Sequence, residues 1–178
     1  MELVTRFQET GEVRHMDELV RRHIGKARSL VFPMVLNDAD ADDVTQQTFL
    51  NAVRHIGSFR GQSDVATWLH RIAINAAYSL LRRKKRCRED RREDVSERVD
   101  PSAGPDRRVM GLELGVQIGK AMGALPDSLR AAITLTAIHG MSVKEAARTE
   151  GCLAATMYWR VFEARRILGK RLEGAMAL

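Results

Sequence analysis

The sequence lacks the features that secreted and membrane-spanning proteins need. Its 178 residues contain only two cysteines, Cys87 and Cys152, which are too few for a disulfide framework. No apolar run approaches the roughly 18 residues that a membrane-spanning helix requires. The first residues include Glu2 and Arg6 and contain no apolar signal core. We therefore expect a cytoplasmic protein without membrane insertion.

Sequence motifs of common enzymes are missing as well. There is no phosphate-cradling glycine loop, no nucleophile elbow and no HExxH pair. The five histidines are scattered, and neither cysteine has a partner at metal-ligand spacing. Cys152 could be a reactive thiol, but a buried small residue is the preferred interpretation. The sequence predicts no catalysis, no cofactor and no metal site.

Positive charge is the clearest feature that the sequence does have. Lysine and arginine number 29 against 23 aspartate and glutamate residues, which gives a formal net charge of +6. Hydrophobic residues make up 44% of the chain, enough to bury a core. A basic chain of this size suits a polyanionic partner such as nucleic acid, although many basic proteins bind none.

Apolar residues recur at helical spacing in the first half, where three helices are predicted. The first ends near Pro33 and has the apolar face Val20, Ile24, Ala27 and Val31. The second begins in the acidic segment 38–43, ends at Gly57 and has the buried stripe Val44, Phe49, Ala52, Val53 and Ile56. The third begins at Ser63 or Asp64, ends in the basic run 82–86 and has the stripe Val65, Leu69, Ile72, Ala76 and Leu80.

The helical pattern stops between residues 88 and 108. This segment is charged on all sides and ends with Pro101, Gly104 and Pro105, so its apolar content cannot offset the entropy of ordering. We expect an all-α protein with a small helical domain over 12–87, a flexible charged linker over 88–108 and a second helical domain over 109–178.

The second domain contains the strongest local signal. A helix through Leu129, Ile133 and Ala137 is predicted to end at Gly140. Ser142 precedes Glu145 by three residues, which is the spacing of a capping box at the start of a helix over 143–150. A glycine and a longer helix over about 155–172 complete a helix-turn-helix. The small Ala147 lets the two helices cross closely, Gly151 tolerates positive φ at the turn, and the apolar Met157 packs the second helix onto the first.

The second helix of such a motif enters the major groove of DNA. The side chains expected to face base edges or phosphates are Thr156, Tyr158, Trp159, Arg160, Arg165 and Arg166. A plain helical hairpin with a solvated basic face would produce the same periodicity, and that alternative stays open on periodicity alone.

Three segments resemble one bacterial protein family. Residues 58–63 (SFRGQS) and 67–75 (TWLHRIAIN) resemble conserved region 2 of the extracytoplasmic-function (ECF) sigma factors, which are minimal transcription initiation factors. Residues 40–49 (DADDVTQQTF) resemble the helix by which the family binds core RNA polymerase, and residues 125–172 resemble region 4. The likeness covers most of the chain outside the linker and the first dozen residues.

The resemblance implies a subunit that binds core polymerase, recognises the −10 and −35 promoter elements and promotes DNA melting. Residues matching those that dock on the clamp of the largest polymerase subunit are Asp43, Gln46, Gln47 and Phe49. Residues matching the −10 site are Phe59, Arg60, Gly61, Ser63, Ile72 and Asn75, and phosphate contacts are expected at Arg82 and Arg83. Region 4 would rest on the β-flap and read the −35 duplex through Thr156, Tyr158, Trp159, Arg160 and Arg165. The resemblance further implies control by a cognate anti-sigma factor.

Some positions keep a structural alternative or depart from the family. Phe59 could be a core residue, Trp68 is more plausibly core than a DNA contact, and the run 82–86 could be a solvated helix end. In region 4, Glu150 replaces an apolar residue, Glu163 replaces a frequent arginine, and Tyr158 and Trp159 are unusual. We therefore expect an unusual −35 preference, with aromatic contacts to thymine methyls. The alternative function is a helix-turn-helix regulator that binds operators without core polymerase.

Overall fold

The computed structural model of the chain describes residues 2–90 and 109–176, so most of the predicted linker lies outside the described residues. Helices and helical turns form all of the regular structure in this part, which confirms the all-α prediction. In chain order they are α1 (Glu2–Thr10), α2 (Val13–Val35), α3 (Asp38–His55), η1 (Ile56–Ser58), α4 (Val65–Asp90), α5 (Val109–Gly123), α6 (Asp127–Ile133), η2 (Thr134–Ile138), α7 (Val143–Glu150) and α8 (Ala154–Met176). Within these ranges, no helix combines the length and the apolar character needed to cross a bilayer.

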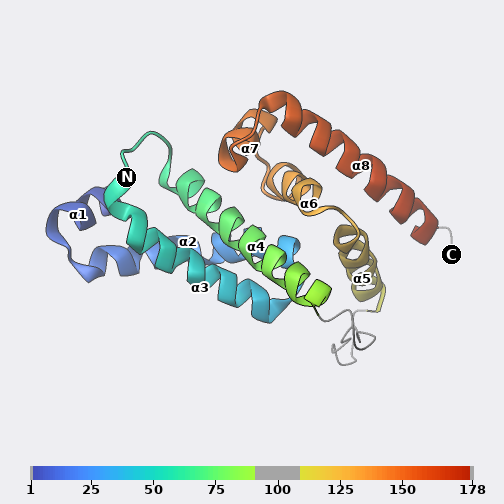
Figure 1. Cartoon of the computed structure of the whole chain (residues 1–178), viewed down its shortest axis with the longest axis horizontal. Coiled ribbons are helices and arrows are strands. Elements are labelled where there is room, and N and C mark those ends of the chain that lie inside the picture. The colour runs from blue at the N-terminus through green and yellow to red at the C-terminus, as the bar shows by residue number, and fades with distance from the viewer. Residues whose placement is uncertain (1, 91–108, 177–178) are drawn as a thin grey trace.

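Helices α1 to α4 form the first module, in which α2, α3 and α4 pack against one another and α1 packs on α2 (Figure 1). Asn37 caps α3 by accepting a hydrogen bond from the amide of Asp40 at 2.9 Å. Helix α1 was not predicted from the sequence, and it is anchored by Val4, whose exposed fraction is 1%. The apolar core of this module contains Val4, Met16, Leu19, Ala27, Phe49, Ala52, Ile56, Val65 and Leu69.

The predicted apolar faces of the first two helices were wrong at two positions. Ile24 and Val53 are exposed, with exposed fractions of 46% and 43%. Helix α2 instead buries Leu19, Leu30 and Met34, because it is contacted by α1, α3, α4 and α6 and therefore has no single buried stripe. Pro33 lies inside α2, which ends at a left-handed Leu36 with φ of 57°.

Helices α5 to α8 form the second module, and its helix-turn-helix prediction is confirmed. Ser142 and Glu145 form the reciprocal capping box, and Gly151 closes α7 in the left-handed conformation with φ of 72°. Met157 is fully buried behind the turn. Ala137, predicted on a buried face, is exposed because the π-helical turn η2 changes the register after α6.

The two modules are packed against each other. Figure 1 shows α6 and α7 between α4 and α8, and α4 contacts both α6 and α7. One apolar cluster spans both modules, and its larger members are Leu30, Val31, Met34, Val44, Ile74, Leu80, Leu135, Met157 and Val161. The sequence did not indicate how the modules sit relative to each other, because the linker composition sets no angle.

Candidate nucleic-acid and polymerase interface

The outer face of α3 carries the residues predicted to bind polymerase. Asp43, Gln46 and Gln47 are exposed, and the amide of Gln47 donates to the side-chain oxygen of Asn51 at 2.9 Å. Phe49 lies elsewhere: its exposed fraction is 7%, and it packs in the core of the first module. In this structure the side chain of Phe49 packs α3 onto the rest of the first module.

Sequence reasoning missed two apolar residues on this face. Leu50 and Val53 are exposed and lie one and two helical turns from Gln46. The same i, i+4 and i+7 spacing could have found them, but Val53 was assigned to the buried stripe because it is apolar, and Leu50 was given no role. Together with the three polar residues they form a mixed surface, which we call the α3 face and define as Asp43, Gln46, Gln47, Leu50 and Val53.

The segment between η1 and α4 holds the predicted base-capturing loop, residues 59–63. The ring of Phe59 packs on Trp68 with 5.0 Å between ring centroids, and both residues lie against the core of the first module. Gly61 has φ of 69°, a conformation that favours glycine. Arg60 and Ser63 are exposed at the tip. The loop is therefore a turn with a packed base and a polar, solvent-facing tip.

Helix α4 continues this surface with a polar stripe. Ile72 is partly buried in the first module, and Asn75 is exposed on the next turn. The Ser79 hydroxyl donates to the carbonyl of Asn75 at 2.8 Å, and the guanidinium of Arg82 donates to Ser79 Oγ at 3.4 Å. The predicted base-reading and phosphate-binding side chains thus follow one line along the helix.

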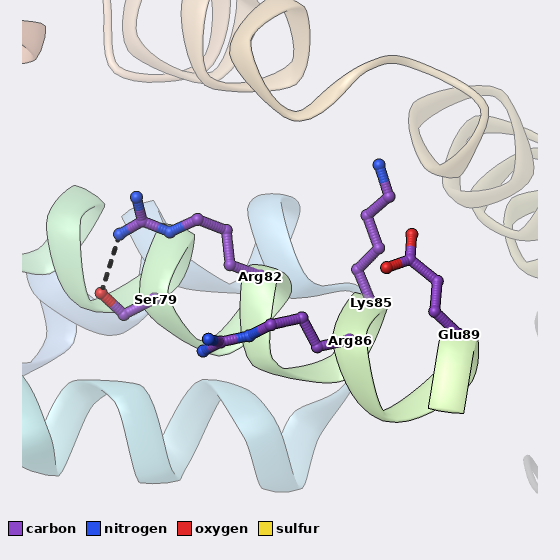
Figure 2. Close-up of a pocket in the computed structure, with 5 residues that line it drawn as sticks. All are labelled: Ser79, Arg82, Lys85, Arg86 and Glu89. Carbon is purple, nitrogen blue, oxygen red and sulfur yellow. Dashed lines mark hydrogen bonds between the residues drawn. The ribbon is translucent and has the colours of Figure 1, made fainter. Parts of the chain in front are cut away.

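The C-terminal end of α4 is strongly cationic. An open hollow of about 500 Å³ is lined by Ser79, Arg82, Lys85, Arg86 and Glu89. Figure 2 shows these side chains, with Arg82 turned toward Ser79. Arg83 is exposed on the same helical end. Lys84 differs from its neighbours because its ammonium group pairs with Asp40 of α3. Phosphate contacts are therefore available to Lys85 and Arg86 as well as to the predicted Arg82 and Arg83.

Helix α8 exposes an apolar and cationic surface. Tyr158, Trp159 and Phe162 have exposed fractions of about 60%, and Arg165 is exposed one turn later, whereas Thr156 is half-buried. Phe162 was missed by sequence reasoning, although its spacing from Tyr158 places it on the same helical face.

Glu163 forms an ion pair with a neighbouring residue of α8. The guanidinium of Arg166 binds its carboxylate through two contacts of 2.6 and 2.8 Å. This hydrogen bonding holds the pKa of Glu163 below its usual value. The negative charge is therefore matched by a neighbouring cation on the same helix.

Glu150 joins the two modules. Its side chain is 3% exposed, accepts a hydrogen bond from the hydroxyl of Tyr78 on α4, and pairs with the guanidinium of Arg160 on α8. Burial and the bond to Glu150 raise the pKa of Tyr78, which stays a hydroxyl donor. Arg160, predicted to read DNA, is thus engaged by Glu150 in this structure.

Two histidines meet at the same boundary. His70 of α4 and His139 after η2 lie with 6.0 Å between ring centroids, and the buried His70 Nδ1 and His139 Nε2 have no hydrogen-bond partner among the described residues. Burial, and then the charge of His139, lower the pKa of His70 to about 4. The described residues contain no group of three potential metal ligands.

Comparison with known proteins places both modules in one family. The family described as Sigma-70 region 2 matches residues 19–87, and the family described as Sigma-70, region 4 matches residues 115–168. The RNA polymerase sigma-H factor of Pseudomonas aeruginosa is 33% identical over 97% of this chain and 93% of its own length. The ECF RNA polymerase sigma-E factor of Escherichia coli K12 is 33% identical over 96% of this chain and 93% of its own length.

Solved structures agree with this assignment across both modules. CnrH in complex with the cytosolic domain of CnrY matches with a TM-score of 0.70 and 29% identity over 97% of this chain and 96% of that chain. The sigma factor RpoE in complex with the anti-sigma factor NepR from Bartonella quintana matches with a TM-score of 0.71 and 25% identity over 88% of this chain and 96% of that chain. Sequence and structure together show that the chain belongs to the ECF family of RNA polymerase sigma factors.

Proposed function

We propose that this sigma factor acts in the cytoplasm, binds core polymerase through the α3 face, and reads the −10 and −35 elements with its first and second modules. The observation that carries the proposal is the juxtaposition, within one module, of the α3 face, the loop 59–63 and the polar stripe of α4. A regulator that binds operators without core polymerase needs neither a polymerase-binding face nor a base-capturing loop. The clamp of the largest polymerase subunit is the proposed partner of the α3 face, and the β-flap that of the second module.

The −10 chemistry follows from the loop and the stripe. Extruding a base costs a few kcal/mol of stacking, which a site must return through contacts made only to the flipped base. The amide of Asn75 offers both a donor and an acceptor to a base edge, and Arg60 and Ser63 are exposed at the tip of the loop. Arg82 and Arg83 attract the phosphates of the same strand. Binding free energy from DNA and core enzyme drives melting, with no nucleotide hydrolysis.

The −35 chemistry rests on the exposed surface of α8. Tyr158, Trp159 and Phe162 present apolar area to the major groove, where the thymine methyl is the apolar feature. Arg165 supplies a cation for phosphate or guanine. We propose a −35 element rich in thymine, read mainly by aromatic contacts.

We also propose control by an anti-sigma factor. Two similar structures are complexes. In one, CnrH is bound to the cytosolic domain of CnrY, and in the other, the sigma factor RpoE is bound to the anti-sigma factor NepR. A protein of this class would compete with core polymerase for the α3 face. Capture from unstressed cells tests this, and Leu50→Asp is the matched variant that should lose the partner. Absence of any such partner would contradict the proposal.

Run-off transcription with purified core polymerase and a pre-melted promoter bubble tests the main proposal. The wild-type chain should confer start-site choice. Asn75→Ala should weaken −10 selection by about 1–3 kcal/mol while core affinity is retained, and Gln46→Ala should lower core affinity. Tight binding of intact duplex without core enzyme would identify an operator-binding regulator instead.

A further inference from the structure

Helix α1 reaches the loop that the proposed function assigns to −10 recognition. It lies outside the residues matched by the Sigma-70 region 2 family, which begin at residue 19. Its side chain Gln8 donates through Nε2 to two backbone carbonyls, Ile56 at 2.6 Å and Phe59 at 3.0 Å. These carbonyls belong to the two ends of the turn that leads into the loop, and the Phe59 amide also donates to Ile56 at 3.1 Å.

Packing holds α1 where this contact is possible. Val4 is buried, and Leu3 and Phe7 pack against the cluster that contains Ile56 and also contacts Phe59. The far end of the loop is held separately, because Asp64 accepts a hydrogen bond from the amide of Ala66 at 3.2 Å. Gln8 therefore fixes the entry of the loop, and α4 fixes its exit.

We infer that Gln8 is a positioning residue for −10 base capture. This inference rests on the proposed function. The amide of Gln8 touches no DNA-facing atom itself. It holds the backbone at Phe59 so that the side chains of Arg60 and Ser63 are kept in one conformation. Without this contact, the loop would populate several conformations, of which only some could capture a base.

Two variants remove the donors of Gln8 without touching the core. Gln8→Glu keeps the size and adds a charge, whereas Gln8→Leu adds no charge. The matched control is Glu9→Leu on the adjacent exposed position of α1. The probe is a promoter bubble with randomised non-template bases at the −10 element, bound to the complete holoenzyme and sequenced.

Both variants should reduce base selection about fivefold, while the affinity for core polymerase and the thermal unfolding temperature of the protein stay unchanged. Glu9→Leu should behave like the wild type. Gln8→Arg, which keeps N–H donors, should restore part of the selection. Unchanged selection in both variants would overturn the inference. If the wild type itself selects no base, the proposed function fails instead.

A second inference rests on the contact between the modules. The −10 and −35 elements lie about 25 base pairs apart, which is about 85 Å of duplex at about 3.4 Å per base pair. In this structure α4 contacts α7 directly, so the two DNA-reading surfaces are too close to occupy both elements. The modules must separate before the chain can span a promoter.

We propose that Tyr78, Glu150 and Arg160 form a latch that keeps the chain closed. Tyr78 comes from the first module, and Glu150 and Arg160 come from the second. Because the carboxylate of Glu150 is almost fully buried, it depends on both partners in the closed state. Opening breaks the Tyr78 bond and leaves Arg160 and Glu150 paired within the second module.

Small-angle X-ray scattering of the full chain tests the latch without reference to polymerase. Tyr78→Phe removes one hydroxyl and should increase the radius of gyration, and Glu150→Gln should do the same. Tyr158→Phe is the matched loss of an exposed hydroxyl and should leave the radius unchanged. Tyr78→Phe should also tighten core binding about fivefold, because it raises the population of the open chain. Wild-type dimensions in both latch variants would overturn the proposal.

Discussion

At the scale of single residues, Arg130 satisfies four backbone carbonyls at the boundary of the modules. Its guanidinium donates to Met34 of α2 at 2.5 Å, and to Met122, Gly123 and Leu125 at 3.0 to 3.3 Å. The side chain is buried, and desolvation lowers its pKa, although Asp127 lies 3.6 Å away and acts in the opposite direction. One planar group thus closes the end of α5 and ties α2 to α6.

Arg130→Met should lower the free energy of unfolding by about 3–4 kcal/mol. The methionine fills similar volume but leaves buried carbonyls without donors. Arg130→Lys should recover little, since a single ammonium cannot reach four acceptors in a fork. Urea unfolding followed by circular dichroism measures the difference. Arg171→Met, on an exposed position of α8, is the control and should change stability by less than about 0.5 kcal/mol.

His70 gives the chain a pH dependence of known sign. Its pKa is lowered to about 4 by burial first, then by His139, His23 and Lys26, while Asp64 raises it. The unfolded chain binds a proton near the ordinary value of 6.5, so between pH 6.5 and 4 it binds more protons than the folded chain. Stability should therefore fall as the pH drops through this window, by less than about 1.4 kcal/mol per pH unit.

Urea unfolding at a series of pH values checks this expectation. His70→Phe should flatten the slope between pH 6.5 and 4, whereas His55→Ala, on an exposed position of α3, should keep it. Below pH 4 the contribution of His70 should level off, because both states are then protonated. An identical slope in wild type and His70→Phe would assign the pH dependence to other groups.

At the scale of elements, α7 depends on its cap. It has eight residues, too few for a helix that is stable in isolation. Glu145 accepts from the Ser142 amide at 2.8 Å, and these bonds to Ser142 hold the pKa of Glu145 below its usual value. Ser142→Ala should lower the free energy of unfolding by about 1 kcal/mol, measured by thermal denaturation. Ser29→Ala, an exposed serine within α2, is the control, and an equal loss there would contradict the capping account.

The elements also show which predictions the sequence allowed. The capping box, Gly151 and Met157 were predicted correctly because each depends on residues within one or two turns. The exposure of Ile24 and Val53 could not be predicted, since it depends on which helices pack beside α2 and α3. Periodicity alone ranks every apolar position on a face equally.

The candidate site divides in the same way. The polar residues of the α3 face, the loop tip, and Tyr158, Trp159 and Arg165 of α8 followed from the family resemblance and helical spacing, and their binding roles stay predictions. The exposed apolar residues Leu50, Val53 and Phe162 did not. Phe49 was assigned to an interface, but it is buried in a core cluster with Leu19 of α2 and Leu69 of α4, and spacing within α3 alone could not indicate those neighbours. The contact of Tyr78 with Glu150 joins residues 72 positions apart, so no local pattern could indicate it.

At the scale of the whole molecule, the cationic end of α4 should dominate the salt dependence of promoter binding. Each phosphate contact that is lost should reduce the slope of log affinity against log salt by about 0.7–0.9. Replacing Arg82 and Arg86 with glutamine should therefore reduce the slope of the holoenzyme by about 1.5. Lys84→Gln is the control, because its ammonium is already paired with Asp40. Equal slopes in all three proteins would place the phosphate contacts elsewhere.

The apolar cluster that both modules build has a consequence for the cell's supply of this protein. Met34, Ile74 and Leu135 belong to that cluster and are almost completely shielded from water. Separation of the modules exposes part of this cluster to solvent. A chain that opens without binding polymerase should therefore close again or associate with another copy of itself. Surplus protein should thus be self-limiting, and overproduction should yield aggregates before it yields competition for core enzyme.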